Sequence, residues 1–230
     1  MIVGEQKPFE EIVRLIAGRK RVLVAGCGTC VSVCFAGGEK EAGILASMLR
    51  LHAQKNGQAV EITEATVKRQ CDNEFLDELA AKVEAVDAVL SVACGCGIQF
   101  LAERFPKKLI LPGLNTRFIG VTLEQGEWSE RCAMCGDCIL DRTGGICPVA
   151  RCAKRLHNGP CGGSSKGKCE VGQDRDCAWA LIVERLKNLD ALDRYSEILP
   201  LRDWRTSRDG GPRKVVREDL KDQAHPEAKK

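Results

Sequence analysis

The feature that most constrains this chain is a segment in its C-terminal half that is rich in cysteine and poor in apolar residues. Between Cys132 and Cys177 there are eight cysteines and only seven large apolar residues, while glycine, proline and short polar runs fill the remainder. Ordering the backbone costs roughly 1–2 kcal/mol per residue, and so little apolar material cannot offset that cost by burial. We therefore expect bound metal, rather than a hydrophobic core, to hold this segment.

The rest of the composition is that of a globular protein from a reducing compartment. The 230 residues are 44% hydrophobic and 29% charged, and no apolar run approaches the ~20 residues of a membrane helix. The N-terminus lacks the pattern of a secretory signal, so we expect a cytoplasmic protein without a membrane span. In that compartment, 14 cysteines indicate metal or redox chemistry rather than disulfides. The net charge of +3 is carried by the last 26 residues, and no nucleic-acid surface is predicted.

The first 125 residues alternate between strand-like and helix-like patterns. Short β-branched or alternating runs predict strands at 21–25, 59–65, 87–93 and 108–111. Apolar residues at helical spacing predict helices at 9–16, 39–51 and 75–83, with a short helix between the last two strands. This alternation is typical of an α/β fold with a doubly wound parallel sheet covered by helices on both faces.

The patterns divide the chain into three regions. Residues 1–125 are predicted to form the α/β domain, with a cluster site at the carboxyl ends of its strands. Residues 126–204 are predicted to form a cysteine-rich, metal-stabilised module that ends in a helix beginning at Ala178. Residues 205–230 are charged and almost free of apolar side chains, and we expect them to be a disordered tail.

Six cysteines lie in the α/β region, and their positions relative to the strands suggest a common site. Cys27 follows the first predicted strand of the sheet, Cys71 follows the second, and Cys94 and Cys96 follow the third. Residues just beyond the carboxyl ends of parallel strands converge on one crevice, where such folds bind ligands. Four thiolates there suit a [4Fe–4S] cluster, which we favour, or a structural zinc ion. The preferred ligands are Cys30, Cys34, Cys71 and Cys94, with Cys27 as the competitor.

Other interpretations of these cysteines are weaker. The sequence Gly26-Cys27-Gly28 resembles the start of a dinucleotide-binding loop, but Val31 occupies the position of the third glycine. Cys27 and Cys30 form a C-x-x-C pair, which a thiol oxidoreductase could use. Cys96 could equally be a small buried hydrophobic residue, because Cys94 lies beside it.

The C-terminal cysteines give a stronger signal. Cys132, Cys135 and Cys138 have the C-x-x-C-x-x-C spacing with which three thiolates surround one corner of a cuboidal cluster. Cys147 precedes a proline and is the expected fourth ligand, although its separation from Cys138 exceeds that of the bacterial ferredoxin pattern. The remaining cysteines could form a second four-thiolate site for zinc or a cluster, or one could replace Cys147: Cys152, Cys161, Cys169 and Cys177.

These segments resemble a known family. The blocks GGICPVARCAKRLHNGPCGGSSKGKCEVGQDRDC and AWALIVERLK, together with GCGTCVSVCFAGGEKEA and ACGCGIQ, are similar to the accessory iron–sulfur subunit (MetV type) of acetogenic methylenetetrahydrofolate reductase. The resemblance covers roughly residues 1–204, and the C-terminal block is also similar to the cysteine-rich C-terminal region of related reductases.

The resemblance implies a non-catalytic subunit with about two [4Fe–4S] clusters, and with zinc as a further metal. Such a subunit receives electrons from a redox donor protein. It passes them to a flavin-containing catalytic subunit, which reduces methylenetetrahydrofolate to methyltetrahydrofolate in the one-carbon (Wood–Ljungdahl) pathway. The alternative is a zinc-stabilised scaffold subunit without an electron-transfer role. An apolar helix face from Trp179 to Leu189 either docks the partner or closes the cysteine-rich module.

Overall fold

The computed structural model describes residues 1–220, and the chain divides into two compact units, Met1–Arg131 and Cys132–Lys230. The boundary thus lies a few residues beyond the one predicted at residue 125. Among the described residues, none of the helices has the length and apolar character to cross a membrane.

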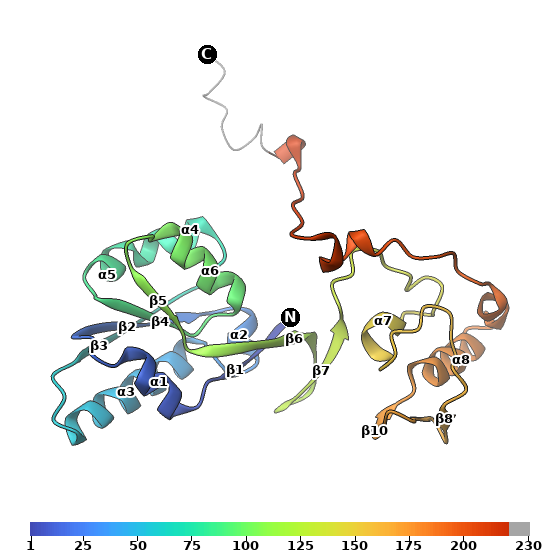
Figure 1. The fold of residues 1–230 in the computed structure, drawn as a ribbon, viewed down its shortest axis with the longest axis horizontal. Coiled ribbons are helices and arrows are strands. Elements are labelled where there is room, and N and C mark those ends of the chain that lie inside the picture. Colours follow the sequence, from blue (N-terminus) through green and yellow to red (C-terminus); the bar gives the residue numbers. More distant parts are fainter. Residues whose placement is uncertain (221–230) are drawn as a thin grey trace, which may run out of the picture. The chain divides into compact units, whose positions relative to one another are not determined.

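The first unit is built on a four-stranded parallel sheet, as the sequence predicts (Figure 1). Its strands are β2 (Arg21–Cys27), β3 (Glu61–Val67), β4 (Ala88–Ser91) and β5 (Leu109–Pro112). Their order is β3-β2-β4-β5, so the chain runs outward from β2 to β3 and then crosses to the other side at β4. The reversal of strand order therefore lies between β2 and β4, which is where ligand crevices form in such sheets.

Helices cover both faces of this sheet (Figure 1). One face is covered by α1 (Phe9–Ile16) and α3 (Glu39–Lys55), and the other by α4 (Asn73–Leu76), α5 (Ala80–Glu84) and α6 (Gly95–Arg104). The predicted helix at 75–83 is therefore divided, because a 3-10 turn at Asp77–Leu79 separates α4 from α5.

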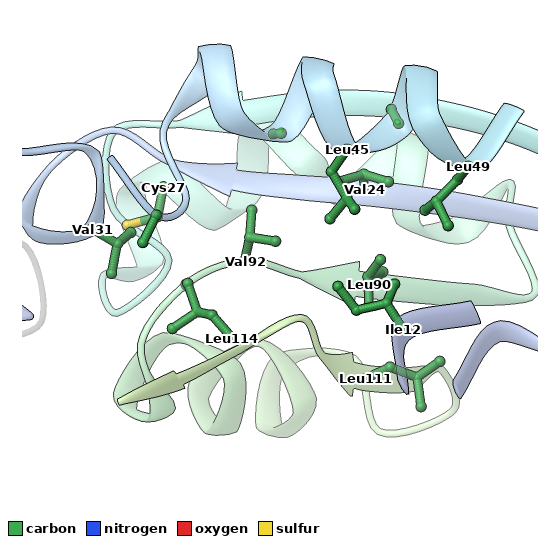
Figure 2. Packing of buried hydrophobic residues seen from close by; sticks show 14 of the residues in the cluster. Ile12, Val24, Cys27, Val31, Leu45, Leu49, Leu90, Val92, Leu111 and Leu114 are labelled. Atoms are coloured by element: carbon green, nitrogen blue, oxygen red, sulfur yellow. The ribbon is translucent and has the colours of Figure 1, made fainter. Parts of the chain in front are cut away.

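The core of the first unit follows from the alternation of side chains along the strands. On β2, Val22 and Val24 belong to the cluster that packs against α1 and α3, with Val24 seen beside Leu45 in Figure 2, whereas Leu23 packs toward the helices of the opposite face. All three are fully buried. Both faces of a central strand are thus apolar, which is why this strand reads as a continuous hydrophobic run.

A second sheet in the first unit was not predicted from the sequence. It is antiparallel, with the order β1-β6-β7, and comprises β1 (Ile2–Gln6), β6 (Leu114–Glu124) and β7 (Glu127–Cys132). The register pairs Ile2 with Ile119 and Gln6 with Leu114. Strands β6 and β7 form a hairpin at whose turn Gly126 adopts a φ of 92°, a conformation that glycine adopts readily.

The second unit has little regular structure. Its elements are short: α7 (Pro148–Arg151), β8 (Ser164–Ser165), β9 (Lys168–Cys169), β10 (Gly172–Asp176) and α8 (Ala178–Asn188). The described part of this unit has one cluster of buried apolar side chains, formed by Trp179, Ile182 and Leu186 of α8 with partly buried neighbours. The apolar face of α8 therefore closes the module, which decides between the two roles expected for it.

The segment after Arg202 is partly ordered. Short 3-10 helices form at Trp204–Thr206 and Arg208–Gly210, and Ser207 between them is buried. The Thr206 hydroxyl donates a hydrogen bond to the Cys135 carbonyl (2.9 Å), so this segment is attached to the three-cysteine loop. Residues 205–210, predicted as the start of a disordered tail, therefore contain helical turns, and residues 221–230 lie outside the described residues.

Candidate metal centres

The first candidate site lies at the carboxyl ends of the parallel strands, where three chain segments bring thiols together. Cys27 is the last residue of β2 and pairs with Val67, the last residue of β3. Cys71 lies four positions after Val67. Cys94 follows the end of β4 at Ser91 by three positions and immediately precedes α6. The parallel register thus gathers cysteines that lie far apart in the sequence, as the strand-end positions predict.

The charges of these thiols interact. Burial raises the pKa of Cys71, and the negative charges of Cys94, Cys27 and Cys96 raise it further. The pKa of Cys96 is also raised, by burial first and then by the charge of Cys94, a hydrogen bond with that thiol, and the charge of Cys30. Cys71 and Cys96 thus each lie near other thiols of this region, and a bound cation would relieve the repulsion that raises their pKa values.

The Cys34 sulfur makes its contacts with strand β1. Helix α2 (Cys30–Val33) ends before it, and Phe35 has a φ of 53°, so the chain turns Cys34 toward β1. There the Gly4 amide donates to the Cys34 sulfur (3.4 Å), and the Cys34 thiol lies 3.7 Å from the Gly4 carbonyl oxygen. Cys34 is buried in the core cluster of the first unit.

Cys96 lies in the group, although the sequence analysis left it as either a buried hydrophobic residue or a ligand. It is exposed, in the first turn of α6, and is coupled to Cys94. The signal that could have identified it is its position two residues after a strand-end cysteine at the start of a helix.

A buried polar network connects the strand ends that carry these cysteines. Gln70 is fully buried, and its side-chain amide donates to the carbonyl oxygens of Ala25 and Gly26, each at 2.9 Å. Its side-chain oxygen accepts a 2.6 Å hydrogen bond from the Ser91 hydroxyl, which in turn accepts one from the Ala93 amide. Gln70 thus connects the ends of β2 and β4 to the segment that carries Cys71.

The second candidate site is the loop that carries Cys132, Cys135 and Cys138. The Met134 amide donates to the Cys132 sulfur (3.4 Å), as amides commonly do toward metal-bound thiolates. Gly136 adopts a φ of 83°, and a Cβ there would lie 2.2 Å from the Thr206 carbonyl oxygen. The loop therefore needs glycine both for its conformation and for its close packing.

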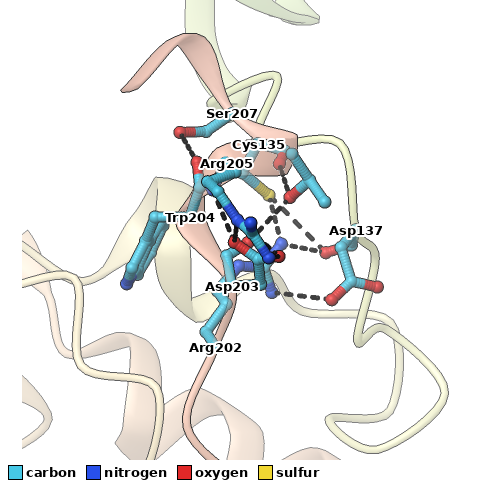
Figure 3. Close-up of polar contacts among 8 residues, drawn as sticks. Cys135, Asp137, Arg202, Asp203, Trp204, Arg205 and Ser207 are labelled. Atoms are coloured by element: carbon cyan, nitrogen blue, oxygen red, sulfur yellow. Dashed lines mark hydrogen bonds and ion pairs between the residues drawn. The ribbon is translucent and has the colours of Figure 1, made fainter. Parts of the chain in front are cut away.

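A buried arginine contacts this loop (Figure 3). The side chain of Arg202 is only 2% exposed, and its Nη2 donates to the Cys135 sulfur (2.9 Å) and to the Asp137 carbonyl oxygen. The Asp137 carboxylate lies 3.8 Å from Nη1, beyond hydrogen-bond distance. The guanidinium also stacks on Trp204, with 5.1 Å between Cζ and the ring centroid.

Several nitrogens around this contact are buried without a hydrogen-bond partner in the described part of the chain. They are Nε and Nη1 of Arg202 and Nδ1 of His157. Burial lowers the pKa of His157, and the positive charge of Arg202 lowers it further. Because buried donors are rarely left unpaired, an acceptor-rich group beside Cys135 fits this site, and the sulfides and thiolates of an iron–sulfur cluster supply such acceptors.

Cys147, the expected fourth ligand, is half-buried and immediately precedes Pro148 at the start of α7. Its assignment to the three-cysteine loop stays a prediction.

The remaining four cysteines surround one cavity. Cys152, Cys161, Cys169 and Cys177 all line a small cavity of about 20 Å³, beside Lys154. The Gly163 amide and the Lys154 ammonium both donate to the Cys161 sulfur, at 3.4 and 3.6 Å. A cavity of this size holds about one water molecule, so it fits a single ion rather than a cuboidal cluster.

The cysteine side chains do not have the arrangement of a complete metal site in the described residues. Within residues 1–220, no group of three or more histidine, cysteine, aspartate or glutamate side chains has the arrangement that could hold a metal ion. Metal binding by any of these cysteines is therefore a matter for proposal.

Comparison with known proteins adds evidence on the second half of the chain. No curated protein and no solved structure matches this sequence. Residues 111–205, from the end of β5 to the segment after Trp204, match the family model described as "Methylene-tetrahydrofolate reductase C terminal".

Proposed function

We propose that this chain is an iron–sulfur electron-transfer subunit that serves the flavin-containing catalytic subunit of a methylenetetrahydrofolate reductase. The family match over residues 111–205 supports the connection to this enzyme class. The resemblance of the N-terminal cysteine segments to the MetV-type subunit supports the more specific role. In this role the chain receives electrons from a redox donor protein and passes them to the partner flavin for the reduction of methylenetetrahydrofolate.

The observation that carries the proposal is the gathering of thiols at the reversal of strand order. Cys27, Cys71 and Cys94 come from three different segments, and the register of β2, β3 and β4 brings those segments to one edge. Such an edge is the usual ligand site of a parallel sheet, and here it presents thiols. A [4Fe–4S] cluster held by four of the group, which also includes Cys30 and Cys96, supplies one-electron transfer.

A second cluster is proposed at the three-cysteine loop, with Cys132, Cys135, Cys138 and Cys147 as ligands. The support is the spacing of the first three and the unpartnered buried nitrogens beside Cys135. Two residues outside the loop keep Cys135 oriented, because Arg202 contacts its sulfur and the Thr206 hydroxyl donates a hydrogen bond to its carbonyl oxygen.

A structural zinc ion is proposed for the last four cysteines. The cavity that they line favours one ion over a cluster, and four thiolates at about 2.3 Å are the usual ligands of structural zinc. Zinc there is compatible with the electron-transfer role and also with the alternative, a zinc-stabilised scaffold subunit.

Metal and sulfide analysis of protein purified without oxygen tests the proposal. We expect about eight iron and eight labile sulfide per chain if both clusters are [4Fe–4S], together with about one zinc. A folded preparation that contains zinc but neither iron nor sulfide would favour the scaffold and overturn the electron-transfer proposal.

Two matched variants test the first site. Cys71→Ser should remove about half of the iron, because its thiol belongs to the interacting group. Cys34→Ser should retain the iron, because the Cys34 sulfur accepts a hydrogen bond from the Gly4 amide instead. Equal iron content in both variants would show that the cysteines at the strand ends are not the cluster site.

Electron transfer itself is tested with the catalytic subunit. The dithionite-reduced chain should reduce the partner's flavin, and each two-electron reduction of flavin should oxidise two one-electron centres. The Cys135→Ser variant serves as the comparison, since it should lose one centre and slow flavin reduction. Flavin reduction at the same rate by metal-free protein would contradict this role.

A further inference from the structure

We infer that Arg202 is a positioning residue that raises the reduction potential of the centre at the three-cysteine loop. The inference rests on the proposed function, since it needs a cluster at Cys132, Cys135 and Cys138. It goes further by assigning a role to a residue outside the cysteine pattern.

The first argument is the placement of the guanidinium. Arg202 is separated from Cys135 by 67 positions in the sequence, yet its Nη2 lies 2.9 Å from the Cys135 sulfur. Stacking on Trp204 and the hydrogen bond to the Asp137 carbonyl fix the plane of the guanidinium from two sides (Figure 3). The group is therefore held against the thiol rather than free to turn toward solvent.

The second argument is the unmet hydrogen-bonding capacity of the same side chain. Nε and Nη1 of Arg202 are buried and have no hydrogen-bond partner within residues 1–220. A buried arginine ordinarily satisfies its donors, because leaving them unpaired is costly. Donors of this kind beside a cluster ligand are suited to bind the cluster's sulfides or thiolates.

The third argument is electrostatic. Reduction adds one negative charge to the cluster, and both a nearby positive charge and hydrogen bonds to sulfur stabilise that charge. Because the Arg202 side chain is only 2% exposed, solvent and salt screen its charge weakly. The Asp137 carboxylate at 3.8 Å offsets part of the charge, but it makes no hydrogen bond to Nη1. The net effect of Arg202 is therefore to favour the reduced state.

Arg205 provides a matched control on the same segment. Its side chain is 87% exposed and its guanidinium is paired with the Asp203 carboxylate, which is part of the same short turn. It carries the same charge three positions further along the chain but faces solvent, so its removal should leave the potential unchanged.

The test is a redox titration of the full chain, reduced with dithionite and followed by electron paramagnetic resonance. The centre at this loop is identified as the signal that Cys135→Ser abolishes. In Arg202→Gln the midpoint potential should shift to a more negative value. In Arg202→Lys, which keeps the charge but loses the planar set of donors, the shift should have the same sign and be smaller. In Arg205→Gln the potential should match that of the unaltered chain.

The outcomes separate this inference from the proposed function. If the unaltered chain holds no iron–sulfur cluster at this loop, the proposed function fails and the inference fails with it. If the cluster is present and its potential is the same in Arg202→Gln as in Arg205→Gln, only the inference is overturned. If Arg202→Gln does not retain the cluster, the Arg202→Lys variant decides: a negative shift supports the inference and an unchanged potential refutes it. Loss of the cluster from both variants would make Arg202 a structural residue and would also overturn the inference.

Discussion

Replacing Gln70 should destabilise the ends of β2 and β4, which carry Cys27 and precede Cys94. In Gln70→Leu the Ser91 hydroxyl loses its acceptor, and the Gly26 carbonyl loses a donor, both in a fully buried environment. The Ala25 carbonyl is less affected, because it also accepts a hydrogen bond from the Val92 amide (2.9 Å). The lost hydrogen bond to Gly26 contributes about 1 kcal/mol and the orphaned Ser91 hydroxyl costs about 1–3 kcal/mol, so we expect a destabilisation of about 2–4 kcal/mol.

Native-state hydrogen exchange measured on β2 and β4 is the appropriate assay, because it reports the opening of these strands in the whole chain. A loss of about 2–4 kcal/mol corresponds to roughly 30- to 700-fold faster exchange in the slowest amides. Gln99→Leu is the matched control, since the Gln99 amide makes one exposed hydrogen bond, to the Gly95 carbonyl. It should leave the exchange of β2 and β4 unchanged.

A double variant isolates the cause. Adding Ser91→Ala to Gln70→Leu removes the orphaned hydroxyl, so the double variant should be less destabilised than the sum of the two single variants. If exchange in Gln70→Leu is accelerated no more than in Gln99→Leu, or if the two single effects add, then the buried network does not hold the strand ends as argued.

Three further predictions concern other parts of the chain. Gly136→Ala should destabilise the three-cysteine loop by about 1–3 kcal/mol; limited proteolysis should show this, and Gly145→Ala, which has a similar φ of 89° but no atom within 4 Å of its Cβ, should have a smaller effect. Cys169→Ala should reduce bound zinc from about one per chain toward zero, whereas unchanged zinc would remove Cys169 from the ligand set. Hydrogen bonds from the side chain and backbone amide of Arg21 lower the pKa of Asp87, so the stability it adds is present above the ordinary aspartate pKa of about 3.9 and is lost as pH falls through the lower, folded-state value. Thermal unfolding of Asp87→Asn should therefore differ from that of the unaltered chain at pH 7 and converge with it in acid.

The parallel sheet could be predicted from the sequence because its strands are buried on both faces. Val22, Leu23 and Val24 are apolar without interruption, and such a run between helical patterns has few other interpretations. The antiparallel sheet could not be predicted in the same way. Its strand β1 is only five residues long, and β6 is largely exposed along its second half. Pairing across more than a hundred residues, as between Ile2 and Ile119, leaves no local signal.

The candidate site was predictable to the same extent as the sheet. Cys27, Cys71 and Cys94 could be grouped because their distance from a strand end is a property of the sequence alone. Cys34 was included among the preferred ligands, but α2 ends at Val33 and strand β1, which was not predicted, supplies the Gly4 amide that contacts the Cys34 sulfur. The surroundings of Cys34 could therefore not be predicted, for the same reason as that strand.

The two units should depend on metal to different degrees. In the first unit, Cys27 and Cys94 lie at the strand ends of a sheet with buried apolar side chains on both faces, so their positions do not depend on bound metal. The second unit begins at Cys132, and the buried members of its described apolar cluster are Trp179, Ile182 and Leu186. This is a small core for a unit of that length. The metal proposed for this unit would contribute directly to its folding. A chelator under reducing conditions should therefore abolish protection of α8 in hydrogen exchange while β2 and β4 stay protected; equal protection of both units after metal removal would show that the apolar cluster of α8 suffices to hold the second unit.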